Sequence, residues 1–213
     1  MAEDFCRLAQ AGIRLVSVSH DFQMFGKQYY REIFAKIRAS GVKPGLYLEC
    51  FQLPTKDYID DMLQTFGAEN LVLVISPISG NEKLRRENGK LFSNDDLFDI
   101  VSYIMENKIP LQLYYTLNLV GETREQFYDT YIQMNYLRNV LNLQRVNVFY
   151  QHVVIDPLAG MRDFPEIEVH INTFMDYYRY CQVPTRDYTY TGFIDNGEVP
   201  PEEKKQMYTE LYG

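Results

Sequence analysis

The sequence lacks several features that would assign a protein to a class at once. It has no tryptophan and only three cysteines among its 213 residues, Cys6, Cys50 and Cys181. These cysteines are too few and too far apart for a disulfide framework, and no CxxC, CxxxC or CxxH spacing is present to form a local metal knuckle. We therefore expect three reduced and mostly buried thiols.

Basic charge and long hydrophobic runs are scarce as well. The chain has 21 Lys and Arg against 29 Asp and Glu, which gives a net charge of −8 and a pI near 4.9. This balance argues against binding to nucleic acid or to an anionic membrane by charge alone. No apolar run approaches the roughly 20 residues of a membrane helix, and the acidic first residues lack the order of a secretory signal. With 46% hydrophobic residues, the chain is expected to be globular and cytoplasmic.

The chain alternates between two hydrophobic patterns. Short β-branched runs predict strands, and apolar residues at helical spacing predict helices between them. The expected strands are residues 13–19, 45–50, 71–75, 111–117 and 146–150. The expected helices are residues 28–39, 56–66 after the cap Thr55, one begun by the cap Asn94, 122–141, 167–181 and 200–211. Residues 183–197 have an irregular pattern.

Strands separated by helical crossovers of this length predict repeated βαβ units and hence a parallel sheet. An open doubly wound sheet is disfavoured because no Gly-x-Gly follows Ser19 and no Gly-rich dinucleotide loop follows any strand. The predicted fold is α/β, a partial (β/α) TIM-type barrel with a curved parallel sheet of about five strands, helices outside and a C-terminal helical tail. We expect residues 1–161 to form the barrel and residues 162–213 to pack on it.

Ligands of parallel α/β proteins bind at the carboxyl ends of the strands, and this rule selects the candidate residues. The polar groups at these ends are Ser19, His20, Asp21, Glu49, Ser76, Ser79, Gly80, Asn81, Asn118, Gly121, Glu122, Thr123, Gln151, His152 and Asp156. Simpler interpretations stay open: Asp21 and Asn81 as helix caps, Glu122 as a favourable charge at a helix N-terminus, and the histidines as ordinary polar residues.

Two segments are the most specific. Residues 76–90 read Ser-Pro-Ile-Ser-Gly-Asn-Glu-Lys-Leu-Arg-Arg-Glu-Asn-Gly-Lys, in which a strand ends in a turn of small residues that admits close approach of a ligand. The arginines that follow, Arg85 and Arg86, suit a carboxylate. Residues 117–123, Leu-Asn-Leu-Val-Gly-Glu-Thr, combine a strand end, a glycine turn and an acidic first helical turn.

In this order and spacing, the two segments resemble those of the radical S-adenosylmethionine (radical SAM) domain. The likeness is to the subgroup often preceded by a cobalamin-binding domain, with its "Ser-Pro-Glu-Ser-Gly-Ser…Arg-Arg…Asn-Gly-Lys" and "Gly-x-Pro-Gly-Glu-Thr" segments. Residues 156–160, Asp-Pro-Leu-Ala-Gly, are similar to a proline-glycine turn of that family. Residues 13–161 fit the pattern, which implies a partial barrel of six βα units of which this chain supplies five.

The resemblance also implies cofactors and roles. In the full-length parent, S-adenosylmethionine and a [4Fe–4S] cluster would generate a 5′-deoxyadenosyl radical that acts on a small-molecule substrate. Ser76, Ser79 and Gly80 would line the ribose and methionine region of S-adenosylmethionine, and Arg85 or Arg86 would pair with its carboxylate. The turn with Asn118, Gly121 and Glu122 would approach the adenine, and Glu49 and His20 complete the expected cofactor-binding set.

The sequence departs from the family in two respects. The Cys-x3-Cys-x2-Cys loop that holds the cluster is missing, so no cluster or cofactor is expected on this chain alone. Ile78 also stands where the family usually has Glu, and Asn118 and Val120 replace a Gly and a Pro. These departures indicate either a chain that begins after the cluster loop, whose partner is an N-terminal region with or without a cobalamin-binding domain, or a degenerate relative.

Two other functions remain open. A divalent-metal hydrolase would draw ligands from strand ends, although the HxH pair that such sites often carry is absent; its ligands would be His20, Asp21, Glu49, His152 and Asp156. A non-catalytic module would use the 18 tyrosines and the open edge of the first strand for contact, for instance in a homodimer. No nucleic acid or membrane partner is expected.

Overall fold

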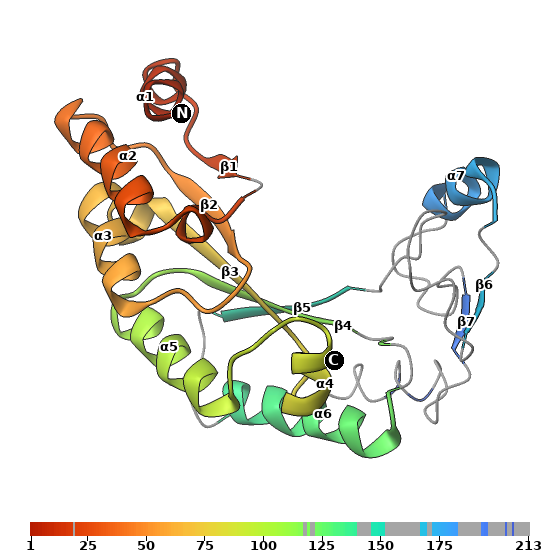
Figure 1. Cartoon of the computed structure of the whole chain (residues 1–213). Helices are drawn as coiled ribbons and strands as arrows, with labels where there is room; N and C mark the ends of the chain where they lie inside the picture. Colours follow the sequence, from red (N-terminus) through yellow and green to blue (C-terminus); the bar gives the residue numbers. More distant parts are fainter. Residues whose placement is uncertain are drawn as a thin grey trace.

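The structure, a computed structural model, describes residues 1–18, 20–116, 119, 122–139, 146–151, 167–169, 172–182, 193–195, 203 and 206 (Figure 1). Its elements, in chain order, are α1 (Ala2–Gln10), β1 (Val16–Val18), the 3₁₀ helix η1 (Phe22–Phe25), α2 (Lys27–Ala39), β2 (Leu46–Cys50), α3 (Lys56–Phe66), the 3₁₀ helix η2 (Ala68–Asn70), β3 (Leu71–Ile78), α4 (Glu82–Glu87), α5 (Asn94–Glu106), β4 (Leu111–Thr116), α6 (Arg124–Asn139), β5 (Val146–Gln151), β6 (Ile167–Val169), α7 (Phe174–Gln182) and β7 (Phe193–Asp195).

The first five strands form one sheet in the order β1-β2-β3-β4-β5, and every neighbouring pair is parallel. Helices α2, α3, α5 and α6 follow one side of this sheet in an arc (Figure 1). A doubly wound sheet would reverse its strand order at one point and carry helices on both faces. The predicted α/β class with a parallel sheet is therefore confirmed, and the arrangement is consistent with a partial TIM-type fold.

The helix-facing side of the sheet forms the hydrophobic core. Side chains of a strand alternate between its two faces, so every second residue of β2, β3 and β4 points toward the helices. The strand residues in this core are Leu46, Leu48, Cys50, Leu71, Leu73, Ile75, Leu111, Leu113 and Tyr115. The apolar stripes of α2, α3, α5 and α6 pack against them, and each fully buried large side chain contributes about 1.5–3 kcal/mol.

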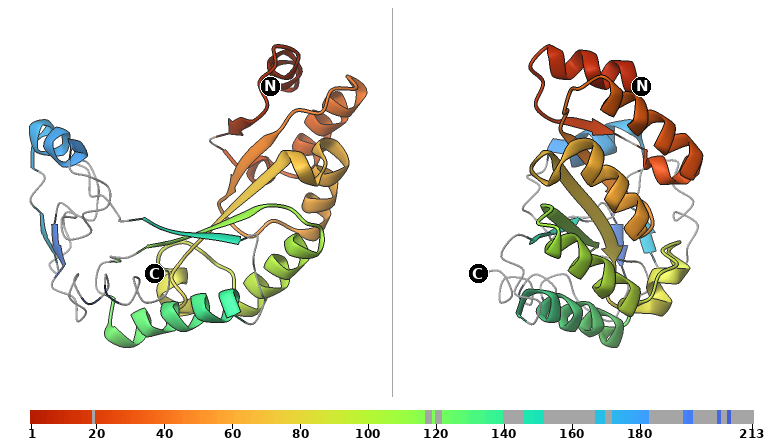
Figure 2. Two further views of the ribbon diagram at one scale, coloured as in Figure 1. Left: turned by 180° about the vertical axis from the view of Figure 1, so that it is seen from behind. Right: turned by 90° about the vertical axis from the view of Figure 1, so that its left-hand side faces the viewer.

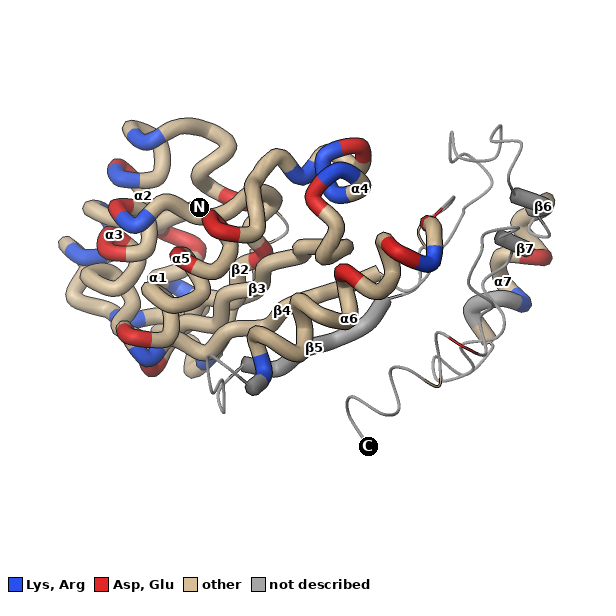
Figure 3. The backbone as a smooth tube through the Cα atoms, turned by 90° about the horizontal axis from the view of Figure 1, so that it is seen from below, with Lys and Arg blue, Asp and Glu red and all other residues tan. Residues whose placement is uncertain are grey.

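Both basic and acidic residues occur along the helices that cover the sheet (Figure 3). Lys27 and Arg31 of α2 pair with Asp57 and Asp61 of α3, each at 2.7 Å. The Lys27–Asp57 pair is solvent-exposed, and in the Arg31–Asp61 pair the arginine is exposed, so each contributes about 1 kcal/mol or less. The helices are thus held mainly by the core beneath them.

Polar side chains set the helix starts. The predicted cap Thr55 accepts a hydrogen bond from the Tyr58 amide, and Asn81 accepts one from the Leu84 amide. The prediction that Asn94 caps α5 is wrong. Ser93 caps this helix in a reciprocal capping box with Asp96, because the Ser-x-x-Asp spacing begins one residue earlier.

The ends of two strands differ from the prediction. β1 begins at Val16, three residues later than expected. The residues before it belong to the turn that ends α1, in which the Ile13 amide donates to the Leu8 carbonyl. β3 extends to Ile78, and its register with β4 shifts between Ile75 and Ile78. Ile78 has a φ of 61°, a left-handed conformation that costs a β-branched residue about 1–2 kcal/mol.

The C-terminal part contains a small antiparallel ribbon. β6 pairs with β7, and the two lie apart from the five-stranded sheet in Figure 1 and in the left view of Figure 2. The predicted helix over residues 167–181 is therefore wrong at its start, because residues 167–169 form a strand. α7 begins at Phe174 because Thr173 and Asp176 exchange hydrogen bonds at its N-terminus.

Two further points concern the chain as a whole. The predicted helix over residues 200–211 lies outside the described residues except for Glu203 and Gln206, both helical. Within the described part, no helix is both long and apolar enough to cross a bilayer.

Candidate ligand-binding site

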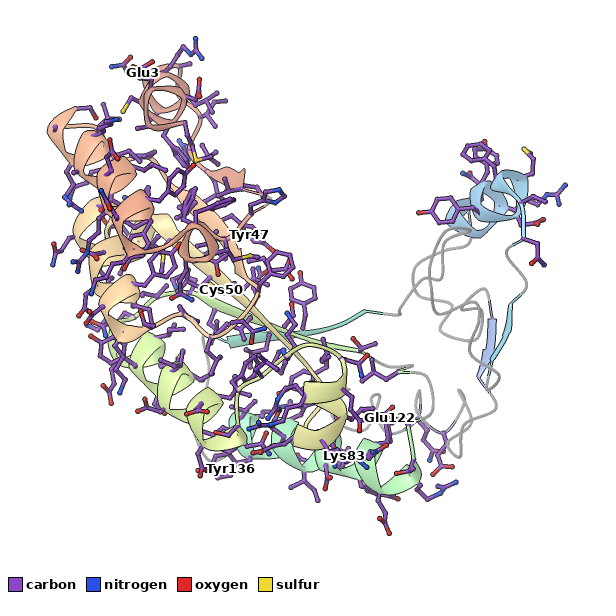
Figure 4. The ribbon with its side chains drawn as sticks, viewed as in Figure 1. Glu3, Tyr47, Cys50, Lys83, Glu122 and Tyr136 are labelled. Carbon is purple, nitrogen blue, oxygen red and sulfur yellow. The ribbon has the colours of Figure 1, made fainter. Side chains whose placement is uncertain are left out.

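The face of the sheet opposite the helices carries polar side chains. Strand alternation places Tyr47 and Glu49 of β2, Ser76 of β3, and Gln112 and Tyr114 of β4 on this side, which we call the inner face. Tyr47 is labelled in Figure 4. In a closed TIM barrel this space is filled by branched apolar residues. The inner face also carries the branched apolar residues Val72 and Val74 of β3. The carboxylate, hydroxyl and amide groups around them are suited to a polar ligand.

Two of the predicted site residues meet at the carboxyl ends of neighbouring strands. The Ser76 hydroxyl donates to the Glu49 carboxylate at 2.7 Å. Ser76 is 9% exposed, whereas Glu49 is open to solvent. A carboxylate has about four acceptor positions, so Glu49 can bind a ligand donor while it holds Ser76 in place.

A second polar contact crosses the sheet lower down. The Tyr47 hydroxyl donates to Gln112 Oε1 at 2.9 Å, and the Tyr114 hydroxyl lies 3.5 Å from the same oxygen. Burial, followed by the hydrogen bond and charge of Tyr114, raises the pKa of Tyr47 to about 12. Tyr47 therefore stays neutral near pH 7 and acts as a hydrogen-bond donor, not as a base.

The turn after β3 packs against α6. Ser79 is fully buried, its hydroxyl lies 3.1 Å from Thr130 Oγ1, and the Gly80 amide donates to the same Thr130 oxygen at 2.8 Å. A Cβ atom at Gly80 would lie 2.4 Å from the Asp129 carbonyl oxygen. The close approach that these small residues permit is thus to the backbone of α6, and a role for Ser79 and Gly80 in binding a ligand stays a prediction.

Arg85 holds the same turn from inside the protein. Its guanidinium is 0% exposed and donates to the carbonyls of Ser79 and Phe92 and to Asn94 Oδ1, at 3.0, 3.2 and 2.7 Å. Burial lowers the pKa of Arg85. These bonds account for its burial without a ligand, so pairing of Arg85 with a carboxylate remains untested; Arg86 is exposed on α4.

The network continues from Arg85 into α6. Asn94 Oδ1 also accepts from Gln133, and Gln133 Oε1 accepts from the Tyr115 hydroxyl, both at 2.6 Å. Next to this network, a cavity of about 420 Å³ lies between α4, α5 and α6, with Gly80, Asn94 and Gln133 in its wall. This cavity is on the helical side of the sheet, so Gly80 borders it and not the inner face.

His20 and Asp21 follow β1, as predicted, but they have different environments. His20 is exposed. Asp21 is 1% exposed and caps η1, since its Oδ1 accepts from the Gln23 amide at 3.0 Å. Burial raises the pKa of Asp21, against the hydrogen bonds that lower it. The capping interpretation of Asp21 is therefore confirmed.

The predicted adenine turn is described only in part. Glu122 is 1% exposed, and its amide donates to the Leu119 carbonyl at 3.2 Å just before α6 begins. Thr123 caps α6 in a reciprocal pair with Gln126. The other predicted residues lie outside the described part of the chain: Ser19, Asn118, Gly121, His152 and Asp156.

The described residues do not form a metal or cluster site. No group of three His, Cys, Asp or Glu side chains comes together in the described part of the chain. Cys6, whose thiol lies 3.1 Å from Ser40 Oγ, and the buried Cys50 are free. Burial, followed by the charges of Asp21 and Glu49, raises the pKa of the Cys50 thiol. A [4Fe–4S] cluster needs three thiolates in one loop, and the residues of this chain do not fit it.

Sequence reasoning missed two parts of this region. Strand alternation alone could have placed Tyr47, Gln112 and Tyr114 together on the inner face. The position of Lys90 could not be predicted from strand alternation. Its ammonium donates to the Phe51 carbonyl at 2.8 Å, because hydrogen bonds join the loop after α4 to the loop after β2. Gln52 makes two of these bonds, to the Gly89 carbonyl and from the Leu91 amide.

No protein-family model and no curated protein sequence matches this chain. Among solved structures, it is similar to the radical S-adenosylmethionine methyltransferase TsrM from Kitasatospora setae, whose structure holds cobalamin and a [4Fe–4S] cluster. The TM-score is 0.56 at 14% sequence identity, and the match covers 97% of this chain and 40% of TsrM. The likeness is one of fold. This chain has the fold of a radical SAM enzyme only in coarse outline, and it spans about two fifths of the longer protein.

Proposed function

We propose that this chain is the S-adenosylmethionine-binding part of a radical SAM core. The observation that carries the proposal is the contact between Glu49 and Ser76 at the carboxyl ends of β2 and β3, on the polar inner face. The similarity of fold to a radical SAM methyltransferase supports it, as do the two sequence segments after β3 and β4.

The side chains of the inner face suit the polar groups of this cofactor. The Ser76 hydroxyl would bond to the ribose, and Glu49 would keep that hydroxyl oriented. The pair of Tyr47 and Gln112 forms the polar layer beneath. S-adenosylmethionine would supply a 5′-deoxyadenosyl radical, with release of methionine, on one-electron reduction by a cluster held in another region; the residues of this chain would bind and orient the molecule and limit access of water.

The remaining parts of the enzyme would come from other regions. Because three clustered thiols are missing, we propose that the chain assembles no [4Fe–4S] cluster and is inactive alone. The partner would be a region with a Cys-x3-Cys-x2-Cys loop, with or without a cobalamin-binding domain, and the substrate a small molecule.

Calorimetric titration of the chain with S-adenosylmethionine tests the binding proposal. Ser76→Ala should weaken binding of both S-adenosylmethionine and 5′-methylthioadenosine by about 5- to 10-fold, since a hydrogen bond is worth about 1 kcal/mol. Ser102→Ala on α5 removes the same hydroxyl far from the inner face and should change neither affinity. A chain that binds neither compound contradicts the proposal.

Anaerobic reconstitution with iron and sulfide tests the second part. Thiolate-bound clusters absorb at about 400 nm. The chain alone should develop no such absorbance, whereas a protein that supplies a Cys-x3-Cys-x2-Cys region should develop it. A stable cluster on the chain alone would show that its cysteines meet in a way that the sequence spacing does not predict.

A second candidate function is a non-catalytic module that assembles through β1. In the described sheet, β1 pairs only with β2 and leaves its other edge open. If two copies pair there, Ser17→Lys should place like charges next to each other and turn a dimer into a monomer in light scattering. A wild-type chain that is monomeric at high concentration argues against this function.

A further inference from the structure

The cavity between α4, α5 and α6 lies outside the proposed cofactor site. Its volume of about 420 Å³ is within the range of small-molecule sites, which runs from about 300 to 1,000 Å³. It is on the helical side of the sheet, whereas Glu49 and Ser76 meet on the inner face. A ligand of this cavity would therefore not compete with one bound at Glu49 and Ser76.

The buried wall of the cavity consists of amide groups that are bonded to one another. Gln133 is 4% exposed and donates to Asn94 Oδ1 at 2.6 Å, and Asn94 Nδ2 donates to the Gly80 carbonyl at 3.2 Å. The Arg85 guanidinium donates to the same Asn94 oxygen from the interior. Because these groups hold one another in place, this wall is formed before a ligand arrives and costs little ordering on binding.

A second wall is apolar and open to solvent. Phe98 of α5 and Tyr136 of α6, which is labelled in Figure 4, pack with their ring centres 4.7 Å apart. Ile132, one turn before Tyr136, is 62% exposed, and Tyr136 is 38% exposed. An aromatic pair beside an exposed aliphatic side chain attracts an apolar group, and the ring faces also attract a cation.

Two carboxylates also line the cavity. Asp129 Oδ2 accepts from Asn81 Nδ2 at 2.7 Å, and Glu82 Oε1 accepts from the Asn94 amide at 2.6 Å. Among the residues that the structure describes, neither carboxylate joins an ion pair, and the lining of the cavity has no Lys, Arg or His. Glu82 interacts at longer range with the buried Arg85. Each carboxylate is thus held by a neutral donor and keeps acceptor positions for a second partner.

We propose that this cavity binds an organic cation, a molecule in which an ammonium or guanidinium group is attached to an apolar chain or ring. The cation would lie against Asp129 and Glu82. The apolar part would cover Ile132 and the rings of Phe98 and Tyr136. An anion would meet two like charges, and a neutral apolar molecule would gain nothing from the carboxylates.

Ligand-observed NMR titration of the full chain tests this proposal with three probes of closely matched size. Phenethylamine, 2-phenylethanol and 3-phenylpropanoate are cationic, neutral and anionic at pH 7. Phenethylamine should bind saturably and at least about tenfold more tightly than the other two. Its affinity should fall with added NaCl, because salt screens the charge interaction. A lysine derivative blocked at both ends represents the other source of the same chemistry, a basic side chain of a partner protein.

Neutral variants of the two carboxylates locate the site. Asp129→Asn keeps an acceptor for Asn81 and should weaken phenethylamine about fivefold. Glu82→Gln should weaken it less, since Arg85 already balances part of the Glu82 charge. Glu125→Gln, one turn earlier on α6 and outside the cavity, removes the same charge and should change the affinity by less than about twofold.

The exposed Ile132 provides a test that leaves the fold unchanged. Ile132→Lys should abolish binding of phenethylamine, and Ile132→Glu should strengthen it. Because most of this side chain is open to solvent, both variants should unfold at the wild-type temperature in circular dichroism. They therefore decide the outcome even if Asp129→Asn or Glu82→Gln is destabilised.

Equal affinities for the three probes, absence of saturable binding, or equal losses in Asp129→Asn and Glu125→Gln overturn the inference. Binding of the blocked lysine derivative without binding of phenethylamine also overturns it, in favour of a partner's side chain. Each of these outcomes leaves the proposed binding of S-adenosylmethionine standing, because that site is on the inner face.

Discussion

At the scale of single residues, Arg85 illustrates how a side chain expected to bind a ligand can serve the fold. A buried guanidinium with three neutral acceptors stabilises the loops that supply them, and removal leaves those acceptors without a donor. We predict that Arg85→Met lowers the free energy of unfolding by about 2–4 kcal/mol, measured by urea denaturation. The exposed neighbour gives the control: Arg86→Met should stay within about 0.5 kcal/mol of wild type. Similar losses for both variants would mean that the contacts of Arg85 contribute little.

The protonation of Asp21 makes the stability of the folded chain depend on pH. Its pKa in the folded state is above the value of 3.8 that applies when it is exposed, because burial disfavours the charged form. The stability that the neutral form provides is fully present below pH 3.8 and is lost as the pH rises through the folded-state pKa. Ionisation of Asp21 thus weakens the fold at neutral pH.

Asp21→Asn should therefore unfold at higher denaturant concentration than wild type at pH 7, since the amide oxygen still caps η1. The difference between the two proteins should vanish as the pH falls below the unfolded-state pKa. Asp21→Ala, which also loses the cap, should be less stable than Asp21→Asn by about 1 kcal/mol. If the difference in stability between Asp21→Asn and wild type did not change with pH, ionisation of Asp21 would not be its cause.

The residue scale is also where sequence reasoning reached least far. The sequence placed residues correctly at helix starts and strand ends: Asp21 and Asn81 are caps, and Glu49 and Ser76 meet on neighbouring strands. It did not predict the contact of Gly80 with α6, because this contact joins segments about 50 positions apart in the sequence. Spacing along the chain carries no information about such a contact.

At the scale of elements, caps decided where helices begin. Ser93 and Asp96 close a capping box, and Asn94 instead lies inside the network of Arg85. We predict that Ser93→Ala costs about 1 kcal/mol in thermal or urea unfolding and that Ser93→Thr restores most of it. Asp95→Asn, in the same first turn but outside the box, should cost only a few tenths of a kcal/mol.

Elements with a long apolar pattern were predicted correctly, whereas the short strands β6 and β7 were not. α2 and α3 lie within a residue of their predicted positions, and α5 begins within a residue of its predicted start, because each buries a full stripe against the sheet. The three-residue strands β6 and β7 depend on pairing with each other. The tyrosine-rich pattern of α7 therefore predicted a helix that began too early, over the residues that form β6.

At the scale of the whole molecule, the core that the structure describes lies in the first part of the chain. Every residue of the described core lies between Ala2 and Leu137. Among the described residues after position 169, Glu203 reaches back to α6 through an ion pair with Arg124. That pair is partly exposed and contributes at most about 1 kcal/mol.

Residues 1–161 alone should therefore fold cooperatively, with a free energy of unfolding within about 2 kcal/mol of the full chain. Circular dichroism and differential scanning calorimetry measure both properties. A non-cooperative transition would place the C-terminal part in the same folding unit and contradict the domain boundary at residue 161.

The strand order β1-β2-β3-β4-β5 has a consequence for how the chain is made. Each strand finds its partner in the segment synthesised immediately before it, so the sheet can grow on the ribosome by one unit at a time without waiting for a distant segment. At every stage the newest strand exposes a fresh row of backbone donors and acceptors. Nascent chains of this protein are thus most vulnerable to misassociation at the strand most recently released, and that position moves toward the C-terminus as translation proceeds.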